Sequence, residues 1–183
     1  MLTSLKFRGS FLSITQYFLI TSSLSSISMV NLINNILGVP RVYEKIMEGM
    51  LAKGKDLKGL KKKISTACKK AGLEFHVHGK NSIMYTVGQK VIYKKVKEAL
   101  GLDRTVSFFS GAAPISLDVM KYFLSLDIKL LELYGMSETS GPQAMSYYNA
   151  YKLGTVGPIF PGAKNRVAEP DDKGEGEVCM WGR

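Results

Sequence analysis

A short polar segment, YGMSET at residues 134–139, carries side chains that together could bind a magnesium nucleotide. Tyr134 has a ring that could stack on a base, because aromatic faces prefer offset stacking and the hydroxyl can stay solvated. Ser137 and Thr139 could donate hydrogen bonds to phosphate oxygens. Glu138 offers a hard oxygen to Mg²⁺, which proteins usually hold with one or two carboxylates and the phosphates of the substrate. The spacing therefore predicts a nucleotide-phosphate and magnesium site.

The element that must position this segment lies directly before it. Residues 127–135, DIKLLELYG, contain an apolar run that predicts a short strand ending at Gly135. The polar side chains then lie on the loop at the carboxyl end of the strand, where α/β sheets bind ligands. Gly135 lets the backbone turn and approach a ligand closely. The alternative is an ordinary polar turn in which Ser137 or Ser140 caps a helix.

Companion segments favour the nucleotide interpretation. Residues 110–114, SGAAP, carry small side chains that would let a flat purine lie against backbone, and Pro114 also suits the start of a helix. Residues 156–162, VGPIFPG, and 176–183, GEVCMWGR, follow in order. These segments, in this order with YGMSET, resemble the adenylate-forming (AMP-binding) superfamily, which includes acyl-CoA synthetases, luciferases and peptide-synthetase adenylation domains.

Longer stretches resemble one particular branch of this superfamily. Residues 38–50, 95–116, 134–146 and 174–183 resemble the bubblegum-type branch of the long-chain fatty acid CoA ligases, and the similarity covers most of residues 36–183. The resemblance implies that a long-chain fatty acid is activated with ATP to an acyl-adenylate and then transferred to CoA as a thioester. It therefore implies ATP, Mg²⁺ and CoA as cofactors and co-substrates.

The resemblance also implies roles for single residues. Ser137 stands where many superfamily members have threonine and keeps the hydroxyl, so it inherits the phosphate role, and Glu138 inherits the metal role. These two are the expected catalytic residues, because a fixed hydroxyl donor and a metal-bound carboxylate would stabilise charge building on the α-phosphate. Gly111, Ala112 and Pro114 inherit the surface on which the adenine lies, and Tyr134 inherits the stacking role. The other residues expected at the nucleotide are Ala113, Gly135, Met136 and Thr139.

The expected fold class is α/β: an incomplete doubly wound sheet of the large N-terminal domain of an adenylate-forming enzyme, with β-rich structure starting at about Thr155. Apolar runs predict strands at SFFSG, IKLLELY, NRVAEP and GEVCMWG, and they alternate with helical stretches such as PISLDVMKYFLSL, where Pro114 and Ser116 suit a helix start. We expect a divergent segment at residues 1–36 and a partial AMP-binding domain at residues 37–183. The family's Ser/Thr/Gly-rich phosphate loop is not found before Gly38, and its C-terminal lid domain would follow Arg183. The expectation is a central, truncated ligase fragment that binds nucleotide weakly and lacks full activity.

The uncharged stretch from Gly9 to Pro40 superficially resembles a signal or membrane anchor. Its interleaved Ser, Thr and Asn weaken a spanning helix, which needs about 20 mostly apolar residues. A divergent or misassembled start of the coding region is the favoured interpretation, and a helix packed on the core is the other.

The net charge of +10 comes largely from lysines at residues 53–70 and 90–97. Lysine predominates over arginine and no recognition motif is visible, so we expect solvated helix faces and loops, and no nucleic-acid partner. Attraction to an anionic membrane is a further possibility that would suit lipid substrates. The expected location is cytoplasmic, with peripheral association at the endoplasmic reticulum membrane as an additional expectation.

Two alternatives to a ligase stay open: a non-catalytic truncated binding module, and a basic membrane-surface or nucleic-acid binder. Dependence on Glu138 rather than on salt would separate the ligase from the basic binder. His76 and His78 alternate as on one strand face and are expected to be plain surface residues, because no further ligand completes a metal site.

Overall fold

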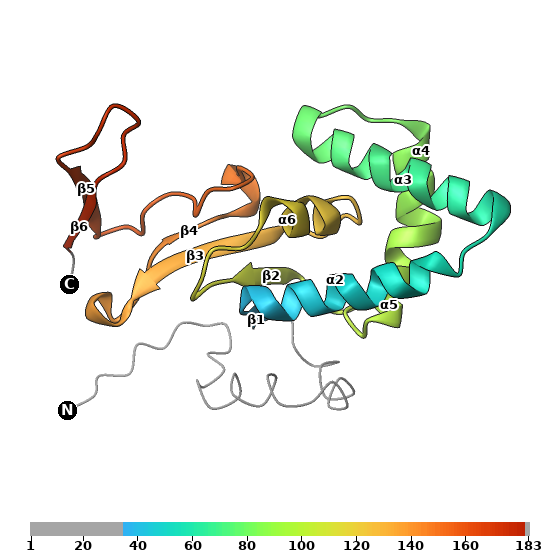
Figure 1. The fold of residues 1–183 in the computed structure, drawn as a ribbon, viewed down its shortest axis with the longest axis horizontal. Coiled ribbons are helices and arrows are strands. Elements are labelled where there is room, and N and C mark those ends of the chain that lie inside the picture. The colour runs from blue at the N-terminus through green and yellow to red at the C-terminus, as the bar shows by residue number, and fades with distance from the viewer. Residues whose placement is uncertain (1–34, 182–183) are drawn as a thin grey trace.

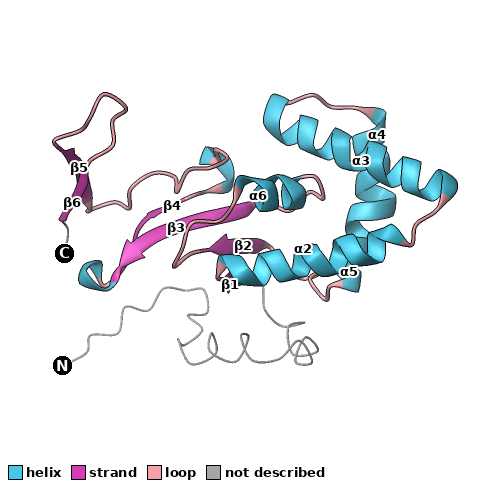
Figure 2. Ribbon diagram, viewed as in Figure 1, coloured by secondary structure: helices cyan, strands magenta, loops and turns pink. Residues whose placement is uncertain are grey.

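The computed structural model describes residues 35–181, and its centre is a mixed four-stranded sheet (Figures 1 and 2). The first three strands in the order β1-β2-β3-β4 run parallel, and the fourth runs antiparallel to the third. The strands are β1 (Asn35–Gly38), β2 (Ser107–Ser110), β3 (Leu130–Met136) and β4 (Gly141–Met145). A separate antiparallel hairpin follows, formed by β5 (Lys164–Ala168) and β6 (Glu177–Trp181).

Helices fill the connections between the parallel strands, because parallel neighbours need a crossover. A group of helices lies between β1 and β2, and one helix lies between β2 and β3. The helices are α2 (Pro40–Lys55), α3 (Gly59–His78), α4 (Ile83–Gly88), α5 (Lys94–Ala99) and α6 (Leu117–Leu124). A π-helical stretch at Gln89–Tyr93 joins α4 to α5, and single 3-10 turns lie at Ser137–Thr139 and Tyr148–Ala150.

Local sequence explains where several helices begin. α2 starts at Pro40, which has no backbone N–H to leave unpaired in the first turn. α6 starts after Ser116, whose Oγ accepts a hydrogen bond from the Val119 N–H at 3.3 Å. α3 ends at His78 and is capped by Gly79, which adopts a left-handed φ of 68° and donates its N–H to the Phe75 carbonyl.

The main core lies between the sheet and the helices α2 and α6. Alternate strand residues share a face, so Phe108 and its register partner Leu130 point the same way, into this core. Tyr43 of α2 and Phe123 of α6 meet edge to face at 5.7 Å. The two helices therefore pack against each other over one face of the sheet.

In a second, smaller core, the helices α3 and α4 pack against the π-helical stretch and the turn after α6. This core consists of Cys68, Ala71, Tyr85, Tyr93 and Leu126. The Tyr93 hydroxyl donates to the Cys68 carbonyl at 2.6 Å. Gly72 allows α3 to lie close to the end of α6, because a Cβ on Gly72 would lie 2.6 Å from the Ser125 carbonyl oxygen.

The structure confirms the α/β class and the expected order of elements, with an incomplete, mostly parallel sheet followed by a β-hairpin after Thr155. The strands expected from SFFSG, IKLLELY, NRVAEP and GEVCMWG all form. The boundary expected at residue 37 stays a prediction, and most of the segment predicted at residues 1–36 lies outside the described residues. None of the helices within residues 35–181 combines the length and the apolar character needed to cross a bilayer.

The expectation of surface histidines holds for His78, which is exposed, but it is wrong for His76, and the strand on which they were expected to alternate does not form. His76 and His78 lie in the last turn of α3, not on a strand. His76 is also not a surface residue: its side chain is 8% exposed, and its Nε2 lies 2.8 Å from Asp127 Oδ1. Alternation over three positions occurs in helices and strands alike, whereas the following Gly79 is the signal for a helix end.

Candidate nucleotide-binding site

The segment YGMSET forms the tip of the hairpin between β3 and β4. The pairing of the two strands shifts register between Tyr134 and Gly135. A Cβ on Gly135 would lie 2.8 Å from the Pro142 Cα and closer still to the Gly141 carbonyl oxygen, so only glycine fits. The sequence predicted that the Gly135 backbone approaches a ligand closely; in this structure the backbone that lies close to it is that of β4. A polar turn does follow the strand, but neither Ser137 nor Ser140 caps an α-helix there, because the chain reverses and pairs back with β3.

Thr139 closes this tip. Its Oγ1 accepts a hydrogen bond from the Met136 N–H at 3.2 Å, and it can donate to the carbonyl of Met136 at 2.9 Å or of Gly141 at 2.8 Å. Ser140 then takes a left-handed φ of 55°. The Thr139 hydroxyl is thus engaged with backbone, which fixes the shape of the loop that presents its neighbours.

Ser137 and Glu138 lie exposed in the 3-10 turn at this tip. Within residues 35–181, neither side chain has a hydrogen-bond or ion-pair partner, so both can reach a ligand in solvent. No group of three or more His, Cys, Asp or Glu residues in the described chain could hold a metal ion. Glu138 alone fits only the kind of magnesium site in which substrate phosphates supply other ligands.

The SGAAP segment leaves the sheet beside this hairpin. Gly111 is buried and donates its N–H to the Gly38 carbonyl at 3.3 Å, and a Cβ on it would lie 3.4 Å from the Cβ of Leu133 on β3. Ala112 has a left-handed φ of 69°, which is strained for a residue with a Cβ. Ala112, Ala113 and Pro114 are exposed, and the loop then enters α6. The structure therefore brings SGAAP and YGMSET to the same edge of the sheet.

The VGPIFPG segment joins the site by pairing with the far side of β4. The Met145 N–H donates to the Pro158 carbonyl at 3.1 Å, and the Phe160 N–H donates to the Gln143 carbonyl at 2.9 Å. The buried Gln143 side chain in turn donates to the Asn165 Oδ1 of β5 at 2.8 Å. The hairpin β5–β6, which carries GEVCMW, is thereby attached to the same region.

A cavity of about 370 Å³ lies where these segments meet. Tyr134 lines it, together with Ala144 of β4, Ile159 of the VGPIFPG segment and Val178 of β6. Its size is at the low end for a ligand pocket, and its wall is mostly apolar. A flat aromatic group could therefore lie against the Tyr134 ring here.

Three buried polar atoms, on β2, on β3 and after the 3-10 turn at Tyr148–Ala150, have no hydrogen-bond partner among the described residues: Ser110 Oγ, Glu132 Oε1 and the Tyr151 hydroxyl. Ser110 and Glu132 are register partners, and alternation along β3 places Glu132 on the same face as Tyr134. Burial raises the pKa of Glu132. Burial and the neighbouring Glu132 raise the pKa of Tyr151 to about 12. Sequence reasoning missed this group, although a glutamate inside an apolar strand run is a signal for it.

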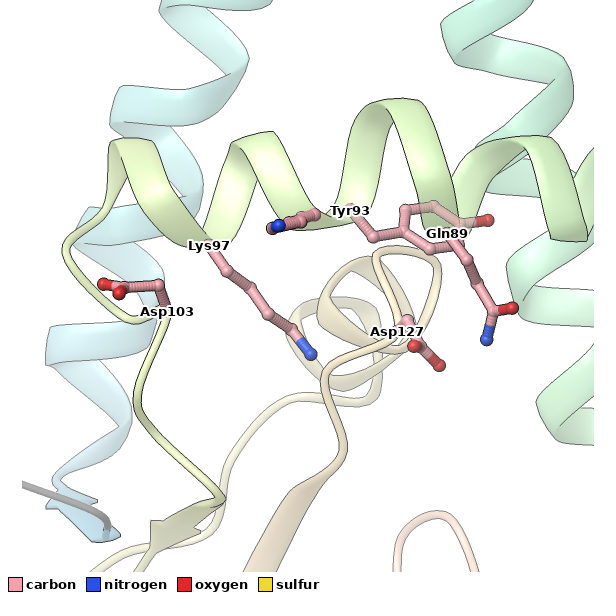
Figure 3. Close-up of a pocket in the computed structure, with 6 residues that line it drawn as sticks. Gln89, Tyr93, Lys97, Asp103 and Asp127 are labelled. Carbon is pink, nitrogen blue, oxygen red and sulfur yellow. The ribbon is translucent and has the colours of Figure 1, made fainter.

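A second cavity, of about 240 Å³, lies away from the motif segments, and Lys97 and Asp127 reach into it (Figure 3). Asp127 Oδ1 accepts hydrogen bonds from His76 at 2.8 Å and from the Tyr85 hydroxyl at 3.0 Å. Burial pushes the pKa of Asp127 upward, but these hydrogen bonds and the charge of Lys97 together hold it below its usual value. These hydrogen bonds join the helices α3 and α4 to the turn before β3. None of the sequence-predicted site residues lines this second cavity.

Comparison with known proteins agrees with the geometry. The family described as AMP-binding enzyme matches residues 31–183. Long-chain-fatty-acid–CoA ligase ACSBG2 of Xenopus laevis is 43% identical over 152 residues, covering 80% of this chain and 21% of that protein. Long-chain-fatty-acid–CoA ligase ACSBG2 of Homo sapiens is 40% identical over 154 residues, covering 80% and 23%. The chain thus spans less than a quarter of the length of these relatives.

A solved structure supports the fold. ATP-bound MatB from Rhodopseudomonas palustris superposes with a TM-score of 0.50 at 20% sequence identity, covering 86% of this chain and 24% of that one. The apo form of the same protein gives the same TM-score at 19% identity. At this level of identity the likeness concerns the arrangement of the backbone alone.

Proposed function

Because the chain belongs to the AMP-binding enzyme family, we propose that it carries the nucleotide-binding part of a long-chain fatty acid CoA ligase. The observation that carries this proposal is that three of the four motif segments line one cavity, through Tyr134, Ile159 and Val178. The fourth, SGAAP, follows β2, the neighbour of the strand that carries Tyr134. The four segments are spread over more than 70 residues of sequence.

The proposed reaction has two steps. An oxygen of the fatty acid carboxylate attacks the α-phosphorus of ATP, and pyrophosphate leaves as the acyl-adenylate forms. The thiolate of CoA then attacks the acyl carbon, and AMP leaves as the thioester forms. ATP and CoA are therefore co-substrates, and a long-chain fatty acid is the acyl donor.

The residues of this chain would bind and orient the nucleotide. Tyr134 would stack on the adenine, with the exposed SGAAP backbone as the opposing platform. The Ser137 hydroxyl, which has no partner within the described residues, would donate to a phosphate oxygen. Thr139 would hold the loop in shape through Met136 and Gly141.

Mg²⁺ fits this donor set, with Glu138 as its protein ligand and the phosphates of ATP as further ligands. When bound, the ion supplies positive charge that offsets the charge on the phosphate oxygens. The exposed position of Glu138 supports this role, because a carboxylate without an ion-pair partner in residues 35–181 keeps its oxygens available.

The protein is proposed to lie in the cytoplasm, with peripheral association at the endoplasmic reticulum membrane. Two features support this: the substrate proposed above is a lipid, and the chain has an excess of ten positive charges. That it has no nucleic-acid partner stays a prediction.

The test is titration calorimetry of ATP on the purified 183-residue chain, with Mg²⁺ and with EDTA, beside a Glu138→Gln variant. The matched control is Glu98→Gln, which removes one exposed carboxylate on α5, a helix that carries none of the four motif segments. We expect Mg²⁺-dependent binding in the wild type and the control, and at least a tenfold loss in Glu138→Gln. Equal binding by all three proteins, or no binding by any, would contradict the proposal.

Formation of oleoyl-AMP, followed in the same samples, separates two forms of the proposal. Adenylate formation would show that the chain itself carries out the first step. Nucleotide binding without adenylate would leave a non-catalytic binding module of the same family.

A further inference from the structure

The first two turns of α3 leave an apolar face uncovered. Apolar residues recur along this helix at helical spacing, and the stripe they form is covered over its second half by the core around Cys68 and Ala71. Over the first half the stripe is open: Leu60 is 72% exposed and Ile64 is 38% exposed. Leu57, in the turn just before the helix, is exposed as well.

Lysines surround this open face. Six of them, Lys53, Lys55, Lys58, Lys61, Lys62 and Lys63, lie within eleven residues that contain a single acidic residue, Asp56, which gives a local net charge of +5 (6 − 1). All six are exposed. In the part of the chain that the structure describes, none of them has a carboxylate within ion-pair distance.

The position of this corner in the fold leaves it accessible. The turn that joins α2 to α3 lies at one end of the molecule, and the β5–β6 hairpin lies at the opposite end (Figure 1). A surface that meets this corner would therefore not touch the candidate nucleotide site at the carboxyl edge of the sheet.

We propose that the corner formed by residues 53–64, called the basic corner, docks the protein on an anionic membrane surface. Leu57, Leu60 and Ile64 enter the boundary between headgroups and acyl chains, and the lysine ammonium groups meet lipid phosphates and carboxylates. Lysine stems can cover apolar surface while their charged ends stay in water, so a mixed face of leucine and lysine suits this boundary.

The chemistry of the basic corner favours a membrane over nucleic acid. Residues 53–64 contain no arginine and no aromatic residue, so they offer neither a bidentate phosphate contact nor a stacking surface. A protruding leucine among lysines has no role in phosphate-backbone binding, whereas it adds to membrane affinity. This inference rests on the peripheral membrane association proposed above and assigns it to a surface.

The test is co-sedimentation of the full chain with vesicles of phosphatidylcholine containing 30 mol% phosphatidylserine, and with vesicles of phosphatidylcholine alone. Each lysine near an anionic surface contributes about fivefold to binding, which corresponds to about 1 kcal/mol. The triple variant Lys61→Glu, Lys62→Glu, Lys63→Glu should therefore bind the anionic vesicles at least about 100-fold more weakly. Leu60→Gln should weaken binding about tenfold and leave its salt dependence unchanged.

The matched control changes the net charge by the same amount elsewhere, through Lys90→Glu, Lys95→Glu and Lys121→Glu, all of them exposed. We expect it to bind within a few-fold of the wild type. Equal losses in the two triple variants would overturn the proposal in favour of non-specific attraction, and so would an absence of vesicle binding by the wild type. Tight binding to single-stranded DNA with no binding to vesicles would point to the nucleic-acid alternative instead.

Calorimetry with ATP on the same variants separates this inference from the proposed function. The variants of the basic corner should bind Mg²⁺·ATP as the wild type does. If the wild type binds vesicles but not ATP, the nucleotide site alone is refuted. If it binds ATP but not vesicles, the basic corner alone is refuted.

Discussion

Replacing Tyr43 with phenylalanine should lower stability through the loss of one hydrogen bond. Tyr43 is 2% exposed, and its hydroxyl donates to the Phe109 carbonyl at 2.7 Å. Burial raises the pKa of Tyr43, so the hydroxyl stays protonated and able to donate throughout the neutral range. Phenylalanine keeps the ring and its edge-to-face contact with Phe123, so no cavity of side-chain size is created.

The magnitude follows from the burial of this pair. A buried acceptor deprived of its donor costs about 1–3 kcal/mol. For a chain of this length each kcal/mol lowers Tm by about 2–4 °C, so a central cost of about 2 kcal/mol lowers it by roughly 4–8 °C. Scanning calorimetry or circular dichroism on the purified Tyr43→Phe chain measures this shift.

Tyr148 provides the matched control. Its hydroxyl also donates to a backbone carbonyl, that of Val106 at 2.6 Å, but Tyr148 is 40% exposed. Water can replace the lost donor there, so Tyr148→Phe should change stability by no more than about 0.5 kcal/mol. Equal shifts in Tm for the two variants, or an unchanged Tm for Tyr43→Phe, would refute the reasoning.

Two carboxyl groups should make stability depend on pH in opposite directions. Burial raises the pKa of Glu132. Its contribution to stability is therefore present below the unfolded pKa and is lost as pH rises through the folded pKa. Glu132→Gln should be more stable than the wild type at neutral pH, and its stability should no longer show this pH dependence. The pKa of Asp127 is lowered, so its contribution is present above the unfolded pKa and is lost as pH falls through the folded pKa. Asp127→Asn tolerates the left-handed φ of 61° at this position, and should cost about 1–3 kcal/mol at neutral pH and converge with the wild type in acid. Urea unfolding from acid to neutral pH measures both; parallel curves for wild type and variant would contradict either prediction.

The elements with strong local signals could be predicted from the sequence. Apolar runs bounded by glycine or proline gave the correct strands β2, β3, β5 and β6, and the Ser116 cap with its apolar face gave α6. β4 was missed because GPQAM has no strand pattern of its own. Pro142 is tolerated at this position, near the start of a strand, and the strand forms because the tight tip returns the chain alongside β3.

The motif residues could be found from sequence, but their surroundings could not. The exposure of Ser137 and Glu138 agrees with a loop at the end of a strand. By contrast, His76 and Asp127 are 51 residues apart, and nothing local in either stretch indicates their hydrogen bond. Likewise, strand alternation gives the face on which Glu132 lies, but not that Tyr151 comes to lie beside it.

The bonds that hold the SGAAP loop have a consequence for the folding pathway. Phe109, directly before the loop, accepts a hydrogen bond from Tyr43 across 66 residues, and Gly111 of the loop donates to Gly38. By contrast, α3 and α4 pack mainly on each other and on the π-helical stretch that follows. Contacts between distant residues form late, because the chain entropy of closing a long loop must be overcome first. We therefore expect pulse-labelling hydrogen exchange to find the amides of α3 and α4 protected before those of β1 and β2. The nucleotide site would then be among the last parts of the chain to assemble during refolding.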